Sequence, residues 1–106
     1  MRAAQEMLAA HPELTALICF NDLVAVGALK ACAQAGLSVP GDIAVVGHDD
    51  VPLAELVTPA LTTCHLSQYE MGQQAVKLLL ERIGGCQESC KEILMPPQLV
   101  IRASAP

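Results

Sequence analysis

The chain has 106 residues, of which 53% are hydrophobic, 2% aromatic and 16% charged. A chain of this length forms at most one small domain. Its core must be built from Ala, Val, Leu and Ile, which favours helices packed on a sheet. The net charge is −5, with only six Lys and Arg residues and no basic run. This excludes DNA binding by the chain alone, because nucleic-acid binding needs clustered cations.

The five cysteines are odd in number and lie in apolar runs or a polar loop, which predicts free thiols in a reducing cytosol. Cys86 and Cys90 have no second ligand pair nearby, so free thiols are favoured over a zinc site. No apolar run has the length of a membrane helix, and residues 1–6 lack the charged-then-apolar order of a signal peptide. We therefore expect a cytoplasmic protein with no membrane contact, no metal and no cofactor.

The first half of the chain predicts a strand–helix–strand unit. A helix over residues 3–10 is followed by a continuous apolar run at 15–20, which is typical of a strand buried on both faces. A mostly apolar helix is expected over 22–35, and a second buried strand over 43–46, ending at Gly47. Short links between these elements predict a βαβ unit with parallel strands, and hence an α/β fold.

The second half predicts a short helical segment at 53–57 and an extended segment at 61–65. An amphipathic helix at 68–83 and a last strand at 99–101 follow. Ser67 and Glu70 form the pattern of a capping box, in which the serine side chain bonds the Glu70 amide. The long helix has one apolar side, formed by Gly72, Ala75, Val76, Leu79, Leu80 and Ile83.

Polar side chains follow both of the expected parallel strands. Asn21 and Asp22 come after the first strand, and His48, Asp49 and Asp50 come after the second. In an open parallel sheet, ligands bind outside the carboxyl ends of the strands. Carboxylates accept hydroxyl hydrogen bonds and amides both donate and accept, so these side chains suit a polyhydroxylated ligand such as a sugar.

The same residue types are also ordinary helix caps and turn residues. We favour such a structural role for Asp22 and Asp50, whereas both roles stay open for Asn21 and Asp49. His48 is expected to be a loop residue rather than a catalyst, because no nucleophile stands beside it. No phosphate-binding glycine loop and no third metal ligand is apparent, so we expect no catalytic residues and no enzyme.

Five motifs occur in order along the chain: NDLVAVGAL, AGLSVPGDIAVVGHDD, TPALTT, EMGQQAVKLLLERI and PPQLVIRAS. Together they closely resemble the lactose-repressor/galactose-repressor (LacI/GalR) family of transcription regulators. The resemblance implies a periplasmic-binding-protein-like (type I) α/β lobe, which is incomplete here. It also implies a two-lobed core that senses a small molecule, and an N-terminal helix-turn-helix that reads the operator.

The resemblance also assigns roles to single residues. Asn21 and Asp49 match positions that bind the effector, and His48 stands where the family usually has an aromatic residue, which makes it a further candidate for effector contact. In the family, the helix at 22–35 and the segment after the aspartates form a dimer interface. The expected interface residues are Val26, Leu29, Leu56 and Val57. For Val26 and Leu29, a place in the core of the monomer remains an open alternative.

The family's chain crosses between its two lobes. About residues 1–64 and 97–106 are therefore expected in the C-terminal lobe and about 65–96 in the N-terminal lobe, with the helix-turn-helix absent. The leading hypothesis is the effector-sensing and dimerising portion of a DNA-binding regulator, a repressor that responds to a sugar-like metabolite. DNA contact is then expected only through a headpiece outside this chain. The alternative is a periplasmic sugar-binding protein of a transport system.

Overall fold

The computed structural model describes residues 1–85 and 92–106, so Cys86 and Cys90 lie outside the described residues. The backbone divides into two compact units. Unit 1 consists of Met1–His65 and Gln98–Pro106, and unit 2 consists of Leu66–Pro97.

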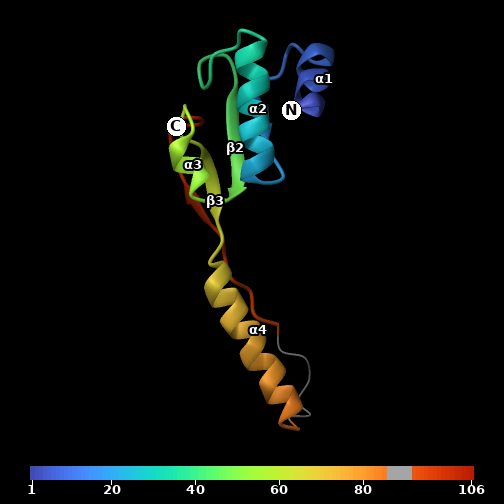
Figure 1. Cartoon of the computed structure of the whole chain (residues 1–106), viewed down its shortest axis with the longest axis vertical. Coiled ribbons are helices and arrows are strands. Elements are labelled where there is room, and N and C mark those ends of the chain that lie inside the picture. The colour runs from blue at the N-terminus through green and yellow to red at the C-terminus, as the bar shows by residue number, and fades with distance from the viewer. Residues whose placement is uncertain (86–91) are drawn as a thin grey trace. The chain divides into compact units, whose positions relative to one another are not determined.

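Unit 1 holds a four-stranded sheet with the strand order β1-β2-β3-β4. Strands β1, β2 and β3 are parallel, and β4 runs antiparallel to β3 (Figure 1). The predicted α/β class and the predicted parallel strand–helix–strand unit, formed by β1, α2 and β2, are both confirmed. The elements of this unit are α1 (Arg2–Ala10), β1 (Ala16–Ile18), α2 (Asp22–Gln34), β2 (Ala44–Asp49), α3 (Leu53–Leu56), β3 (Thr62–His65) and β4 (Gln98–Val100).

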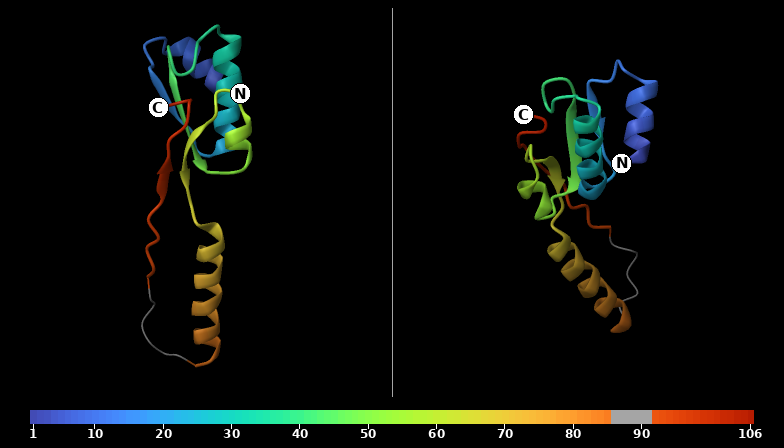
Figure 2. Two further views of the ribbon diagram at one scale, coloured as in Figure 1. Left: turned by 90° about the vertical axis from the view of Figure 1, so that its left-hand side faces the viewer. Right: turned by 45° about the horizontal axis from the view of Figure 1, so that its top comes forward.

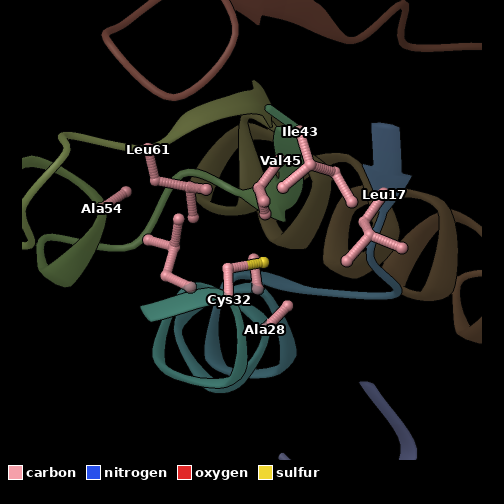
Figure 3. Close-up of a cluster of buried hydrophobic side chains, with 9 residues drawn as sticks. Leu17, Ala28, Cys32, Ile43, Val45, Ala54 and Leu61 are labelled. Atoms are coloured by element: carbon pink, nitrogen blue, oxygen red, sulfur yellow. The ribbon is translucent and has the colours of Figure 1, made fainter. Parts of the chain in front are cut away.

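Helix α2 packs on one face of the sheet, and α1 packs against α2. In Figure 1 and in the right-hand view of Figure 2, α2 lies between β2 and α1. The sheet-facing side of α2 carries small side chains, and Figure 3 shows Ala28 and Cys32 facing the sheet residues Leu17 and Val45. Small residues let the helix come close to the strands, which compensates for the lack of aromatic side chains in the core. The buried cluster comprises Leu17, Ala25, Ala28, Leu29, Cys32, Ile43, Val45, Ala54 and Leu61.

The first strand is buried on only one face, contrary to the sequence prediction. Leu17 points to α2 and is buried, whereas Ile18 is 87% exposed and Phe20, just beyond the strand, is 88% exposed. The strand register puts Ile18 and Leu99 on the face of the sheet away from α2, and Leu99 is exposed as well. An apolar run such as 15–20 predicts cover on both faces of a strand. In the described residues only the α2 face of β1 is covered.

The second strand is longer than the sequence predicted. It does not stop at Gly47 but continues to Asp49, because His48 and Asp49 pair with Cys64 and His65 of β3. Glycine and polar residues normally weaken a strand, but here the neighbouring strand supplies the backbone hydrogen bonds. His48 and Asp49 therefore lie in a strand and not in a loop.

Unit 2 contains α4 (Gln68–Ile83), which confirms the predicted amphipathic helix. None of its residues is buried, and the apolar side chains of Leu79, Leu80 and Ile83 are exposed.

The predicted capping box at the start of α4 is wrong. The Ser67 side chain makes no capping bond, because its backbone (φ −70°, ψ 68°) lacks the extended conformation of a capping residue, and only its carbonyl accepts from Met71. Of the helices in the described residues, none combines the length and apolar character needed to cross a membrane.

Three of the five cysteines lie in the described residues, and all three are free thiols, as predicted. Cys32 is buried in the core, while Cys19 and Cys64 are partly buried. Burial raises the pKa of the Cys19 and Cys32 thiols, which keeps both in the unreactive protonated form.

Candidate functional site

The carboxyl ends of β1 and β2 meet at one end of the sheet, as the parallel register of Ile18 with Val46 requires. We call this region the carboxyl end of the sheet. Asn21 lies there as the N-cap of α2, and its side-chain oxygen accepts a hydrogen bond of 2.9 Å from the backbone amide of Val24. This bond satisfies an otherwise unpaired helix donor. It uses the amide oxygen, so the NH₂ group is the part of Asn21 that can donate to a ligand.

Asp22 has a structural role, as expected, but it is not a helix cap. The residue is 1% exposed. One carboxylate oxygen accepts from the Thr63 hydroxyl at 2.5 Å, and the other accepts from the backbone amide of Val51 at 2.8 Å. The carboxylate thus connects the start of α2 with β3 and with the segment after β2.

Gly47 makes room for this buried carboxylate. A Cβ atom at position 47 would overlap the Asp22 oxygen that Thr63 contacts, and would stand 2.8 Å from Leu61. Such distances do not occur between real side chains, so only glycine fits beside Asp22 on the central strand. The glycine that suggested a strand end in the sequence is therefore a packing requirement.

Asp49 is the last residue of β2, and its carboxylate is partly exposed to solvent. Its side chain is 32% exposed, and one oxygen lies 3.2 Å from Nδ1 of His48, whose side chain is 41% exposed. Among the described residues, no other partner is recorded for the Asp49 carboxylate. This carboxylate can therefore still accept hydrogen bonds, unlike that of Asp22.

Asp50, the second aspartate of the pair, is fully engaged. Its oxygens accept from Arg102 Nη2 at 2.8 Å and lie 3.0 Å from His65 Nδ1. Partial burial raises the pKa of the Asp50 carboxyl, but the hydrogen bond and charge of Arg102, together with His65, outweigh it and hold that pKa below its usual range. Asp50 thus has a structural role, as expected, and it fulfils this role through an ion pair with Arg102.

Sequence reasoning missed Arg102 and His65. Arg102 also donates to the carbonyl of Leu61 at 3.0 Å and to Glu55 at 3.1 Å, and its side chain is 13% exposed. Arg102 is the single charged residue in an otherwise uncharged C-terminal stretch, and that isolation was the available signal. Nothing in the spacing could indicate its partner, because Asp50 lies 52 residues away in the chain.

The C-terminal residues that carry Arg102 are fixed to the sheet. The Ser104 hydroxyl is buried, donates to the carbonyl of Val45 at 2.6 Å and accepts from the backbone amide of Thr62 at 2.8 Å. The Thr62 hydroxyl accepts from the Arg102 amide at 2.8 Å. These bonds hold Arg102 against the strands on which the candidate site is built.

The expected dimer residues differ in their availability. Leu56 is 78% exposed on α3, and Val26 and Val57 are partly exposed. Leu29 is 7% exposed and belongs to the buried cluster of the monomer, which leaves it little surface for a partner.

The sequence matches the family of periplasmic binding protein-like domains over residues 1–105. It is 40% identical to the lactose operon repressor of Rhizobium radiobacter over 102 residues, which cover 96% of this chain and 89% of that protein. It is 46% identical over 92 residues to the transcriptional regulator MalR of Streptomyces coelicolor, covering 87% of this chain but 27% of MalR. The chain thus spans about a quarter of the length of such a longer relative.

Solved structures show the same relationship. A LacI family transcriptional regulator from Arthrobacter sp. FB24, crystallised with lactose, superposes with a TM-score of 0.87 and 39% identity over 99% of this chain and 40% of that one. The lac repressor dimer bound to operator superposes with a TM-score of 0.86 and 33% identity over 98% of this chain and 36% of that one. The fold is therefore a periplasmic-binding-protein-like α/β lobe. The chain belongs to the LacI family of transcription regulators and matches part of its effector-binding core. That family consists of regulators and not enzymes, in agreement with the sequence prediction.

Proposed function

We propose that this chain is the effector-sensing and dimerising portion of a DNA-binding transcriptional repressor that responds to a small sugar-like metabolite. One observation carries the proposal: Asp49 presents a partly open carboxylate at the carboxyl end of the sheet, while the neighbouring Asp22 and Asp50 are saturated by protein partners. Ligands of open α/β sheets bind at this position.

The chemistry of the proposed site fits a polyol. The Asp49 carboxylate accepts hydrogen bonds from two hydroxyl groups, and the Asn21 NH₂ group donates to a third oxygen. His48, beside Asp49, borders the ligand and takes no catalytic part. The lactose complex of the Arthrobacter relative supports a sugar as the class of ligand, because that protein shares the fold over nearly the whole of this chain.

The two units correspond in this proposal to the two lobes of the family's core. About residues 1–64 and 97–106 belong to the C-terminal lobe, and about 65–96 to the N-terminal lobe. The division of the backbone into Met1–His65 with Gln98–Pro106 and Leu66–Pro97 supports this assignment. Operator binding belongs to a helix-turn-helix headpiece outside this chain, and the regulator acts in the cytoplasm.

A homodimer is proposed through α3 and the adjoining surface of α2. The operator-bound relative is a dimer, and Leu56 offers an exposed apolar side chain on α3. Val57 and Val26 lie at the border of this proposed interface. Leu29, which is buried in the core of the monomer, supports the interface from beneath rather than by direct contact.

Leu56→Asp is expected to lower the dimer fraction in sedimentation velocity. Met7→Asp, an equally drastic change on the exposed side of α1, is expected to leave that fraction unchanged.

The effector site is tested by titrating the ¹⁵N-labelled chain with lactose, cellobiose and ribose and following the amide resonances of residues 21 and 47–51. We expect at least one sugar to shift these resonances saturably and Asp49→Asn to weaken that binding by about tenfold, the loss of a charged hydrogen-bond partner. Asp42→Asn is the matched control, because Asp42 is an exposed aspartate that bonds Ser38 in another loop. Equal binding by wild type and Asp49→Asn would disprove the proposed site.

A further inference from the structure

The backbone at the end of β2 has an uncommon conformation. Asp49 has φ of 107° and Asp50 has φ of 54°, and these are the only non-glycine residues with positive φ in the described part of the chain. Residues with a side chain seldom adopt this region, although aspartate does so more readily than most. Two such residues in succession persist only when their surroundings fix them.

The surroundings do fix this turn, and they do so through Asp50. Both oxygens of its carboxylate are engaged, by Arg102 Nη2 at 2.8 Å and His65 Nδ1 at 3.0 Å, and its side chain is 17% exposed. One residue further on, the amide of Val51 donates to the buried carboxylate of Asp22. The backbone after Asp49 is thus held at two successive residues.

The two partners of Asp50 are themselves immobilised. His65 is the last residue of β3 and pairs in register with Asp49. Arg102 is held by its bond to the Leu61 carbonyl and by the bond from its own amide to Thr62. The group formed by Asp50, His65 and Arg102, here named the Asp50 cluster, therefore links the turn to β3 and to the segment after β4.

We propose that the Asp50 cluster positions Asp49 for effector binding by imposing the positive-φ backbone conformation of residues 49 and 50, in which the Asp49 carboxylate stays partly exposed. The inference rests on the proposed function, in which Asp49 binds the effector. Asp50, His65 and Arg102 are positioning residues and do not touch the ligand. A site built from a few hydrogen bonds gains affinity when its groups are held in the bound geometry beforehand.

The backbone part of the proposal is tested without any sugar. Positive φ brings the amide and α protons of one residue close together, so Asp49 and Asp50 of the wild-type chain give strong intraresidue HN–Hα NOEs. Arg102→Gln is expected to weaken both NOEs while the amide shifts of Val45 in the core stay in place. Glu55→Gln is the matched control, because Glu55 also pairs with Arg102 but is exposed and has no bond to Asp50.

Asp50→Asn provides the second variant. Asparagine adopts positive φ at least as readily as aspartate, so weaker NOEs in this variant report the lost ion pair rather than a backbone preference. If Arg102→Gln fails to fold, Asp50→Asn alone tests whether the Asp50 cluster imposes the positive φ of Asp49. Arg102→Lys, which keeps the charge, is expected to restore part of both NOEs. Unchanged NOEs at Asp49 in Arg102→Gln or, where that variant does not fold, in Asp50→Asn would overturn the proposal.

The binding part uses the same lactose, cellobiose and ribose titrations. Asp50→Asn and Arg102→Gln are expected to weaken sugar binding by about tenfold, and Glu55→Gln by less than about twofold. Weakened NOEs with unchanged sugar affinity would overturn the positioning role. If the wild-type chain binds none of the three sugars, the proposed function fails, and the NOEs still decide whether the Asp50 cluster sets the conformation of Asp49.

Discussion

Asp22 and Asp49 lie at the same end of the sheet and have opposite environments. Asp22 is buried and both of its oxygens are bonded, to Thr63 and to the amide of Val51. Asp49 is about one-third exposed, and one of its oxygens contacts His48. The difference separates stability from binding: a saturated carboxylate holds the strands together, and an open one remains available to a ligand. Substitutions at the two positions should therefore have separable effects.

The largest effect on stability is expected from Asp22→Ala. It leaves the buried Thr63 hydroxyl and the partly buried Val51 amide without a partner, and it opens a cavity beside Gly47. We expect the free energy of unfolding, measured by urea denaturation, to fall by about 3 kcal/mol. Asp22→Asn, which keeps the shape and one acceptor, should cost less. A loss below about 1 kcal/mol in Asp22→Ala would show that the network contributes little.

Gly47→Ala tests the same network from the opposite side. The added methyl group would collide with the Asp22 carboxylate and with Leu61, so we expect a loss of about 2 kcal/mol in the free energy of unfolding. Gly72→Ala is the control, because a Cβ at position 72 of α4 has nothing within 4 Å. That control should be neutral or stabilising by up to about 1 kcal/mol, since alanine favours helix over glycine. Equal effects of the two substitutions would contradict the close fit at Gly47.

Asp50 should contribute less to the free energy of unfolding than Asp22 or Gly47, and lowering the pH should reveal its contribution. Arg102 and His65 outweigh partial burial and lower the pKa of Asp50 in the folded chain. The resulting stabilisation is therefore fully present above the unfolded pKa of about 3.9, and it is lost as the pH falls through the lower, folded pKa. Between about pH 5 and pH 2, the urea midpoint should fall less steeply in Asp50→Asn than in wild type or in Glu70→Gln. Identical slopes in all three proteins would refute the ion pair.

The smallest effect on stability is expected from Asp49→Asn. Its side chain is partly exposed and makes a single recorded contact, to His48, so the free energy of unfolding should change by less than about 0.5 kcal/mol. Together with the expected loss of sugar binding, this would separate Asp49 from Asp22. A destabilisation as large as that of Asp22→Ala would place Asp49 in the structural network instead.

The sequence predicted the local parts of this arrangement well. The apolar runs and the short links gave the strand–helix–strand unit, and Asn21 caps α2 as its residue type suggests. The free thiols and the amphipathic helix of unit 2 followed from similarly local patterns.

Longer-range features could not be predicted because they depend on tertiary contacts. Pairing with β3 extends β2 past Gly47, and the ion pair of Asp50 with Arg102 joins residues far apart in the chain. The burial of Asp22 and the exposure of Ile18 depend on which neighbours cover each face of the sheet. Residue type alone suggested similar roles for Asp22 and Asp50, and it left Asp49 undecided. Their partners, contributed by distant segments, distinguish the three.

The most direct test of the account is the carboxyl-carbon NMR spectrum of the wild-type chain with and without a bound sugar. The account predicts that the side-chain carboxyl resonance of Asp49 shifts on addition of lactose, cellobiose or ribose, while the resonances of Asp22 and Asp50 stay in place. A larger shift at Asp22 or Asp50 than at Asp49, or no shift of Asp49 with any of the three sugars, would contradict it.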